Sequence, residues 1–249
     1  MAIITAQEEI AKLRTSGKIA ARALQAVIQA VRPGVTTAEL NEIGETTILK
    51  LGGAPSFKGY EKYPFGLCTS VNDEVVHGMP SSRQLVEGDI IGLDIGVNYQ
   101  GLFSDHAMTV GVGKIDDQKK KLIIDTEEAL RRGLRAVKPG RHIGDIGAAI
   151  QGFLKKHGDY GIVTQLTGHG LGYAVHEPPS IPNVGQAGTG PEIVVGMVLA
   201  IEPMVNLGGL QVTTLDDGWT VVTADHTPAA HAEHTVLVTN RGCEIITKP

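Results

Sequence analysis

The chain has 249 residues and a formal net charge of −5, with 42% hydrophobic and 20% charged residues, the composition of an ordinary globular protein. No apolar run approaches the ~18 residues of a membrane-spanning helix, and the acidic N-terminus lacks the basic-then-apolar pattern of a secretory signal. Two cysteines imply no disulfide framework, and the absence of an extended basic cluster argues against nucleic-acid binding. We therefore expect a cytoplasmic protein.

Two helices are expected at the start of the chain. Apolar residues recur at helical spacing after Thr5, which forms a capping-box pattern with Glu8. The Pro-Gly pair at 33–34 stops this helix. A second helix begins at Thr36, where Glu39 completes another capping box, and it ends at the next Gly-Gly pair.

Strand-like segments follow the helices, and then the pattern starts again. Residues 88–97 and 108–112 are rich in Ile and Val and are predicted to be strands. Residues 117–137 and 143–156 are helical in character. Runs of helices beside runs of strands, without strict β-α-β alternation, indicate an α+β fold rather than a doubly wound sheet.

Four segment pairs match in the same order along both parts of the chain. Residues 31–34 match 137–140 at an offset of 106, and residues 88–94 match 196–202 at an offset of 108. The other two pairs are 76–80 with 175–179, and Asp105-His106 with Glu233-His234. We interpret this as a single domain with two pseudo-symmetric halves, about 1–112 and 113–249. The alternative is that similar strand and turn patterns recur in any α+β protein.

The repeat places two carboxylates in each half, Asp94 and Asp105 in the first and Glu202 and Glu233 in the second. We expect each to end or open an apolar strand, and a lone buried charge costs several kcal/mol unless it is paired. No lysine or arginine lies close in sequence to them. Surface carboxylates at strand ends are the alternative for each acid alone. Together, the four predict a metal site, and a pair of bridging carboxylates suits a dinuclear hydrolase.

The histidines add to this hypothesis. His169 lies between two glycines, where the backbone can approach closely and the ring can reach a metal, and it has no counterpart in the first half. His77 and His176 occupy equivalent positions in the two halves and could donate hydrogen bonds to a substrate. Ordinary core or loop histidines are the alternative. We expect structural roles for His106 and His234, and loop or surface positions for His142, His157, His226 and His231.

With these residues in view, the sequence resembles the type I methionine aminopeptidases, which have the pita-bread fold. The resemblance covers essentially the whole chain, in the short form without a zinc-binding N-terminal extension. The segments that carry it are 70–80, 88–94, 167–176, 200–203, 217–220 and 233–235.

The resemblance implies that Asp94, Asp105, His169, Glu202 and Glu233 hold two divalent ions, with Asp105 and Glu233 bridging. The ions could be Co, Mn, Fe, Zn or Ni, because such a ligand set accepts several metals. The resemblance also implies that His77 and His176 contact the substrate, and that Glu202 accepts the proton of the attacking water. The expected substrates are peptide or nascent-protein N-termini, cleaved after methionine by a monomer that works near the ribosome.

By the same resemblance, the methionine side chain would lie against Tyr60, Tyr63, Cys68 and Trp219. From the residues alone, this aromatic cluster could also be a satellite of the core. One departure from the family pattern is Val175, where phenylalanine is common, and the smaller side chain is expected to widen the pocket or to alter the positioning of the substrate.

Two other functions share the same residues. A related pita-bread enzyme directed at X-Pro bonds usually carries a separate N-terminal domain and a different histidine motif. A non-catalytic peptide-binding relative would lose several ligands, whereas this chain keeps all five and both substrate histidines. The sequence therefore favours the methionine-directed hydrolase.

Overall fold

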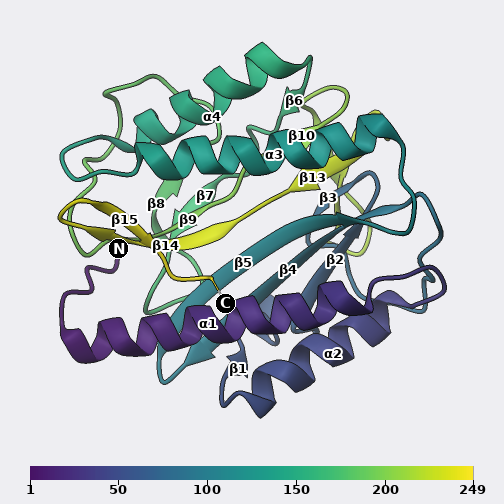
Figure 1. The fold of residues 1–249 in the computed structure, drawn as a ribbon, viewed down its shortest axis with the longest axis horizontal. Coiled ribbons are helices and arrows are strands. Elements are labelled where there is room, and N and C mark those ends of the chain that lie inside the picture. The colour runs from purple at the N-terminus through teal and green to yellow at the C-terminus, as the bar shows by residue number, and fades with distance from the viewer. Residues whose placement is uncertain (249) are drawn as a thin grey trace.

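Two helix pairs lie on the outside of the molecule, with the strands between them (Figure 1). The computed structural model describes residues 1–248. The helices are α1 (Gln7–Ala30), α2 (Thr37–Lys50), α3 (Asp117–Ala136) and α4 (Ile143–His157). A short 3₁₀ turn, η1, spans Tyr60–Lys62. None of the helices in residues 1–248 combines the length and the apolar character needed to cross a bilayer.

The strands form four small sheets in which every described pairing is antiparallel. The first contains β1 (Ala54–Pro55), β2 (Leu67–Val71), β4 (Ile90–Tyr99) and β5 (Leu102–Gly111). The largest contains β7 (Gly168–Gly170), β8 (Glu177–Ile181), β9 (Val198–Ile201), β14 (His234–Thr239) and β15 (Gly242–Ile245). The two three-stranded sheets are β3 (Glu74–Val76), β11 (Val212–Thr214) and β12 (Val221–Thr223), and β6 (Gly161–Ile162), β10 (Met204–Asn206) and β13 (Ala229–His231).

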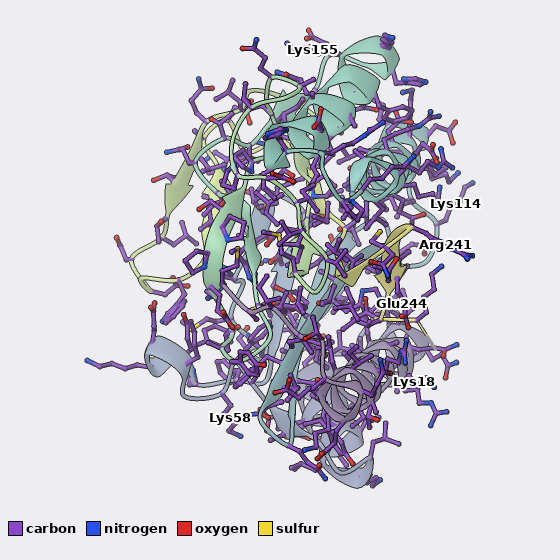
Figure 2. All side chains as sticks on the ribbon, turned by 90° about the vertical axis from the view of Figure 1, so that its left-hand side faces the viewer. Lys18, Lys58, Lys114, Lys155, Arg241 and Glu244 are labelled. Carbon is purple, nitrogen blue, oxygen red and sulfur yellow. The ribbon has the colours of Figure 1, made fainter. Side chains whose placement is uncertain are left out.

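Each helix pair covers one part of the strand layer and buries its own apolar cluster there. Leu24 and Val27 of α1 pack with Leu93 and Ile95 of β4, whereas Leu130 of α3 belongs to a second cluster with α4 and the later strands. Figure 2, turned by 90°, shows charged side chains such as Lys18 on α1 and Lys155 on α4 on the outside. The molecule has an α+β architecture with antiparallel sheets between the helix pairs, the arrangement expected of the pita-bread fold.

The predicted helices are present, but one of the two capping boxes is not. Thr36 accepts a hydrogen bond from the Glu39 backbone, and the Glu39 side chain accepts one from the Thr36 backbone, as predicted. The box expected at Thr5 and Glu8 is wrong, because α1 begins after Ala6 without a side-chain cap. The preceding residues are extended, and the Ile4 N–H donates to the Gly196 carbonyl at 2.8 Å.

The strand limits also correct a prediction. Asp94 and Asp105 were expected to end and open apolar strands, but Asp94 lies in the middle of β4 and Asp105 inside β5. The two strands form one long hairpin, because Gln100 and Gly101 adopt positive φ angles of 50° and 87° at its turn. Such a turn suits the right-handed twist of paired strands. The two aspartates therefore lie within the sheet rather than at its edge.

Strand β7 approaches its neighbours so closely that its glycines cannot carry a side chain. A Cβ built on Gly170 would lie 2.2 Å from the carbonyl oxygen of Pro178, whereas one on Gly152 of α4 would meet nothing within 4 Å. Because the obstacle at Gly170 is backbone, relief requires β7 and β8 to separate. The residue between the two glycines of β7, His169, would move with that strand.

Gly170→Ala should lower the free energy of unfolding by at least about 2 kcal/mol. Gly152→Ala is the matched control and should raise it by roughly 0.5–1 kcal/mol, because alanine is the better helix former. Urea denaturation followed by circular dichroism measures both. Equal stabilities of the two variants would contradict the close approach of β7 and β8.

Candidate metal centre

One cavity of about 200 Å³ opens between the sheets, and all eleven residues that the sequence singled out for the site line it. These are Tyr60, Tyr63, Cys68, His77, Asp94, Asp105, His169, His176, Glu202, Trp219 and Glu233. Both parts of the chain therefore contribute walls to one site. The other lining residues are Phe57, Glu61, Val76, Leu166, Thr167 and Met204.

The hairpin of β4 and β5 supplies the two aspartates. In its register Asp94 is opposite Ala107, and Asp105 is opposite Gly96. Side chains of residues two apart on a strand share a face, so both aspartates project to the same side as diagonal neighbours. Burial and the neighbouring Asp105 raise the pKa of Asp94 well above its ordinary value.

The five-stranded sheet supplies the histidine and the two glutamates. His169 in β7 pairs with Ala200 of β9, and Glu202 directly follows β9. Because Ile201 pairs with His234 of β14, Glu202 lies beside Glu233, which directly precedes β14. The Nε2 atom of His169 is 3.4 Å from Oε1 of Glu202.

The hydroxyl of Thr235 connects the strand that carries Asp105 to the strand that follows Glu233. The Thr235 hydroxyl of β14 donates to the Asp105 carbonyl at 2.7 Å and accepts from the Asp105 N–H at 2.8 Å. Next to it, the Glu233 N–H donates to the Ala107 carbonyl at 2.9 Å. These bonds dock β14 against β5, so that the backbone itself sets the separation between Asp105 and Glu233.

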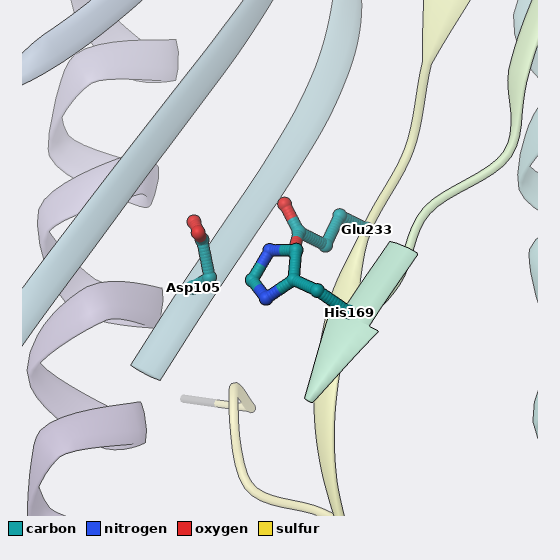
Figure 3. A group of neighbouring side chains, drawn as sticks. All are labelled: Asp105, His169 and Glu233. Carbon is teal, nitrogen blue, oxygen red and sulfur yellow. The ribbon is translucent and has the colours of Figure 1, made fainter. Parts of the chain in front are cut away.

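Three of these side chains converge most closely. Asp105, His169 and Glu233 each offer one ligand atom within 4.8 Å of the others. Figure 3 shows the three side chains approaching one another from β5, β7 and the segment before β14. Asp94 and Glu202 lie outside this tight set but face the same cavity. The arrangement is a cluster of hard oxygen ligands with one imidazole nitrogen.

The cluster lacks a protein cation. Among residues 1–248 no lysine or arginine forms an ion pair with any of the four carboxylates. Burial and mutual repulsion raise the pKa of Glu233 well above its ordinary value, and burial raises that of Asp105 to about 6. The buried oxygens Oδ1 of Asp94, Oδ1 of Asp105 and Oε1 of Glu233 have no hydrogen-bond partner in the part of the chain that the structure describes. Such oxygen atoms suit divalent cations, which would supply their missing partners.

Comparison with known protein families agrees with that reading of the cluster. The model of metallopeptidase family M24 matches residues 11–240. The chain belongs to this family. Divalent metal ions are implied for an M24 metallopeptidase, and the carboxylate and histidine cluster is where the described residues could hold them.

The similar M24 proteins match over their full length. The chain is 47% identical to a methionine aminopeptidase of Clostridium perfringens, covering 99% of both chains, and 44% identical to methionine aminopeptidase 1 of Bacillus subtilis, covering 100% of both. Among solved structures, a methionine aminopeptidase from Thermotoga maritima superposes with a TM-score of 0.97 at 42% identity, with complete coverage of both chains.

A more distant neighbour shows the fold alone. The prolidase from Pyrococcus furiosus is 24% identical, with a TM-score of 0.78, and this chain covers 66% of its length. The X-Pro-directed alternative is therefore not favoured, because the relatives that match over their full length are methionine aminopeptidases.

His77 and His176, which occupy equivalent positions in the two halves of the chain, both line the cavity. His77 has a positive φ of 59°, a conformation that is uncommon for residues with a side chain and often marks functional sites. Burial lowers its pKa to about 4, so its ring is neutral at pH 7. The His176 ring lies edge-on to that of His169, with 4.3 Å between centroids, and its Nδ1 is 3.0 Å from the Tyr60 hydroxyl. Both imidazoles line the cavity, and that of His176 lies against His169.

An aromatic wall closes the other side of the cavity. Tyr63 and Trp219 meet edge to face at 5.1 Å, beside the buried Cys68. The Tyr63 hydroxyl donates to the Leu67 and Gly78 carbonyls, at 3.1 and 3.2 Å, which fixes the ring. Val175 is buried in the same cluster but is not among the residues that line the cavity, whereas Phe57 is.

One residue of the cavity region was missed. His231 was expected in a loop or at the surface, but it ends β13, is only 3% exposed, and has its Nε2 3.5 Å from Oε2 of Glu202. The signal that could have revealed it is its spacing, two residues before Glu233, which places both side chains on one face in an extended segment. His106 and His234 stack on each other at 4.6 Å, and His106 contacts the Glu233 carbonyl through Nδ1 at 2.7 Å, as expected for structural residues.

Asp105→Asn should abolish stabilisation by divalent ions. In the unchanged chain, Mn²⁺ at about 100 times its dissociation constant should add roughly 2.7 kcal/mol to the free energy of unfolding, because the ion binds only the folded cluster. Thermal unfolding with and without Mn²⁺ measures this difference. Asp117→Asn, at a side chain that is 99% exposed on α3, is the control and should respond like the unchanged chain. Full metal stabilisation of the Asp105 variant would exclude Asp105 as a ligand.

Proposed function

We propose that this M24 chain removes the N-terminal methionine from peptides and nascent proteins, using two divalent ions. The observation that carries the proposal is the 47% identity, over 99% of both chains, to the Clostridium perfringens enzyme named methionine aminopeptidase. The residues that would hold the ions are Asp94, Asp105, His169, Glu202 and Glu233. The unpartnered oxygens of Asp94, Asp105 and Glu233 support this set.

When bound, the two cations would polarise the scissile carbonyl and lower the pKa of a water in the cavity. Side chains of the protein then transfer the proton of the water and stabilise the negative charge that develops on the carbonyl oxygen. Glu202 accepts the proton of the attacking water and returns it to the leaving amine, which its place beside His169 at the cavity wall allows. Co, Mn, Fe, Zn and Ni all suit the ligand set.

His176 and His77 hold the substrate. If the Tyr60 hydroxyl donates to Nδ1 of His176, the proton of that ring is on Nε2, which can donate to the carbonyl oxygen as negative charge develops. His77 also lines the cavity, where its neutral ring can hydrogen-bond to the substrate backbone without adding a cation beside the metals.

The aromatic wall is the proposed site for the methionine side chain. A thioether makes favourable contacts with aromatic rings, and Tyr60, Tyr63 and Trp219 present such rings beside Cys68. Phe57, which belongs to the same buried cluster, completes this wall.

The working unit is one chain. All five proposed ligands and both histidines come from the same chain, and both halves supply ligands, which supports a monomeric enzyme of a single domain. We place the reaction in the cytoplasm near the ribosome, where nascent N-termini emerge.

Glu202→Gln should lower kcat by roughly 10³-fold, because the amide keeps the shape of the side chain but cannot accept the proton. The measurement is methionine release from Met-Ala-Ser, with the metal content of each sample determined in parallel. Glu61→Gln changes another glutamate of the cavity wall and should leave kcat within about threefold. Full activity of the Glu202 variant would refute the assigned role.

Peptide selectivity tests the substrate. The chain loaded with Mn²⁺ or Co²⁺ should release methionine from Met-Ala-Ser and Met-Gly-Met, whereas Leu-Ala-Ser should react at least about tenfold more slowly, because a branched side chain fits the aromatic wall less well. A chelator should abolish activity, and added metal should restore it. Faster cleavage of Ala-Pro than of the methionine peptides would favour an X-Pro-directed enzyme instead.

A further inference from the structure

His231 is held in place as firmly as the proposed ligands, although none of the assigned roles involves it. Its N–H donates to the Thr109 hydroxyl of β5 at 2.9 Å, and its carbonyl accepts from the same hydroxyl at 2.8 Å. Thr235 holds the backbone of Asp105 in the same manner. One hydroxyl thus fixes the backbone on both sides of the His231 side chain.

The imidazole of His231 has an unmet hydrogen bond. Its Nε2 is buried and has no hydrogen-bond partner among the described residues. Leaving a buried polar atom unpaired costs about 1–3 kcal/mol, so native proteins rarely do so without a reason. Oε2 of the Glu202 carboxylate is 3.5 Å from this nitrogen. The Asp105 carboxylate is a second negatively charged neighbour of the ring.

The Glu202 carboxylate therefore lies between two imidazoles. On one side, Nε2 of His169 is 3.4 Å from Oε1, and on the other, Nε2 of His231 is 3.5 Å from Oε2. His169 belongs to the tight ligand cluster, so Oε1 is the oxygen that lies next to a member of that cluster. Oε2 is the oxygen that lies next to His231.

We propose that His231 is a positioning residue for Glu202. The Nε2–H of His231 holds Oε2 and would keep that oxygen from binding the same cation as Oε1. This inference rests on the proposed function, in which Glu202 is both a ligand and the proton acceptor. A carboxylate with both oxygens on cations is a poor base, since its lone pairs are already committed. By holding Oε2 apart, His231 leaves this oxygen free to accept the proton of the attacking water. Residues that hydrogen-bond to metal ligands commonly orient those ligands in this way.

A matched pair of substitutions tests the hydrogen bond apart from the shape. His231→Gln keeps an N–H donor, and His231→Met has nearly the same length without one. On Met-Ala-Ser, the Met variant should lose on the order of 10–100-fold in kcat with KM within about threefold, and the Gln variant should recover most of that loss. If both variants lost kcat equally, the hydrogen bond would not be the cause.

Two readouts do not depend on turnover. Calorimetric titration of metal-free protein with Mn²⁺ should give the same number of sites in both variants as in the unchanged chain. Loss of a site or a 100-fold weaker affinity in the Met variant would make His231 a ligand and overturn the proposal. The visible absorption of the Co²⁺ form should weaken in the Met variant, because a second Glu202 oxygen raises the coordination number, and it should be normal in the Gln variant.

Thr109→Val is a second route to the same question if a buried substitution at 231 prevents folding. It removes the hydroxyl that fixes the His231 backbone while retaining the imidazole, so kcat should fall several-fold with the same weakening of the Co²⁺ bands. Unchanged kcat and bands would contradict the proposal. An unchanged chain that binds metal but releases no methionine would refute the proposed function instead, and the Co²⁺ bands would still decide the role of His231.

Discussion

Four carboxylates face one cavity without a lysine or arginine to neutralise them among residues 1–248, and this imbalance governs the rest of the structure. Desolvation would otherwise force protons onto these groups, because an ionised carboxylate is costly away from water. A divalent cation reverses that preference and turns mutual repulsion into shared attraction. The same charges that would destabilise an empty cluster therefore select for hard metal ions.

The backbone prepares this site before any ion arrives. Thr235 and Thr109 each bind both backbone groups of one residue across the junction between β5 and the later strands. Asp105 and His231 are consequently held in place by hydrogen bonds between threonine hydroxyls and their main-chain groups, and not by bonds of their own flexible side chains. Glycines on both sides of His169 allow β7 to lie close to its neighbours, so the imidazole is equally constrained. A site preorganised in this way loses little entropy when it binds its ligand.

Much of this site could be predicted from the sequence, because the carboxylates lie in segments that repeat and His169 lies between glycines. Such signals are local and survive without knowledge of the fold. The capping box at Thr5 failed because a distant segment, at Gly196, holds the preceding residues extended. The positions of Asp94 and Asp105 within their strands depended on the Gln100-Gly101 turn, which apolar patterning does not reveal. His231 escaped notice because its importance comes from its neighbour Glu202, 29 residues earlier in the chain.

The hydroxyl junction between β5 and β14 also has a consequence for the timing of synthesis. The proposed ligands are spread along the chain from Asp94 to Glu233, and Asp105 meets its junction partner only when Thr235 has been made. While the chain grows from its N-terminus, the aspartates of the first half are therefore present without the ligands of the second half for most of translation. Contacts between residues so distant in sequence form late and slowly. The unfinished polypeptide therefore lacks hydrolytic activity. Activity arises only when Glu233, the last proposed ligand in the sequence, has left the ribosome and β14 has packed against β5.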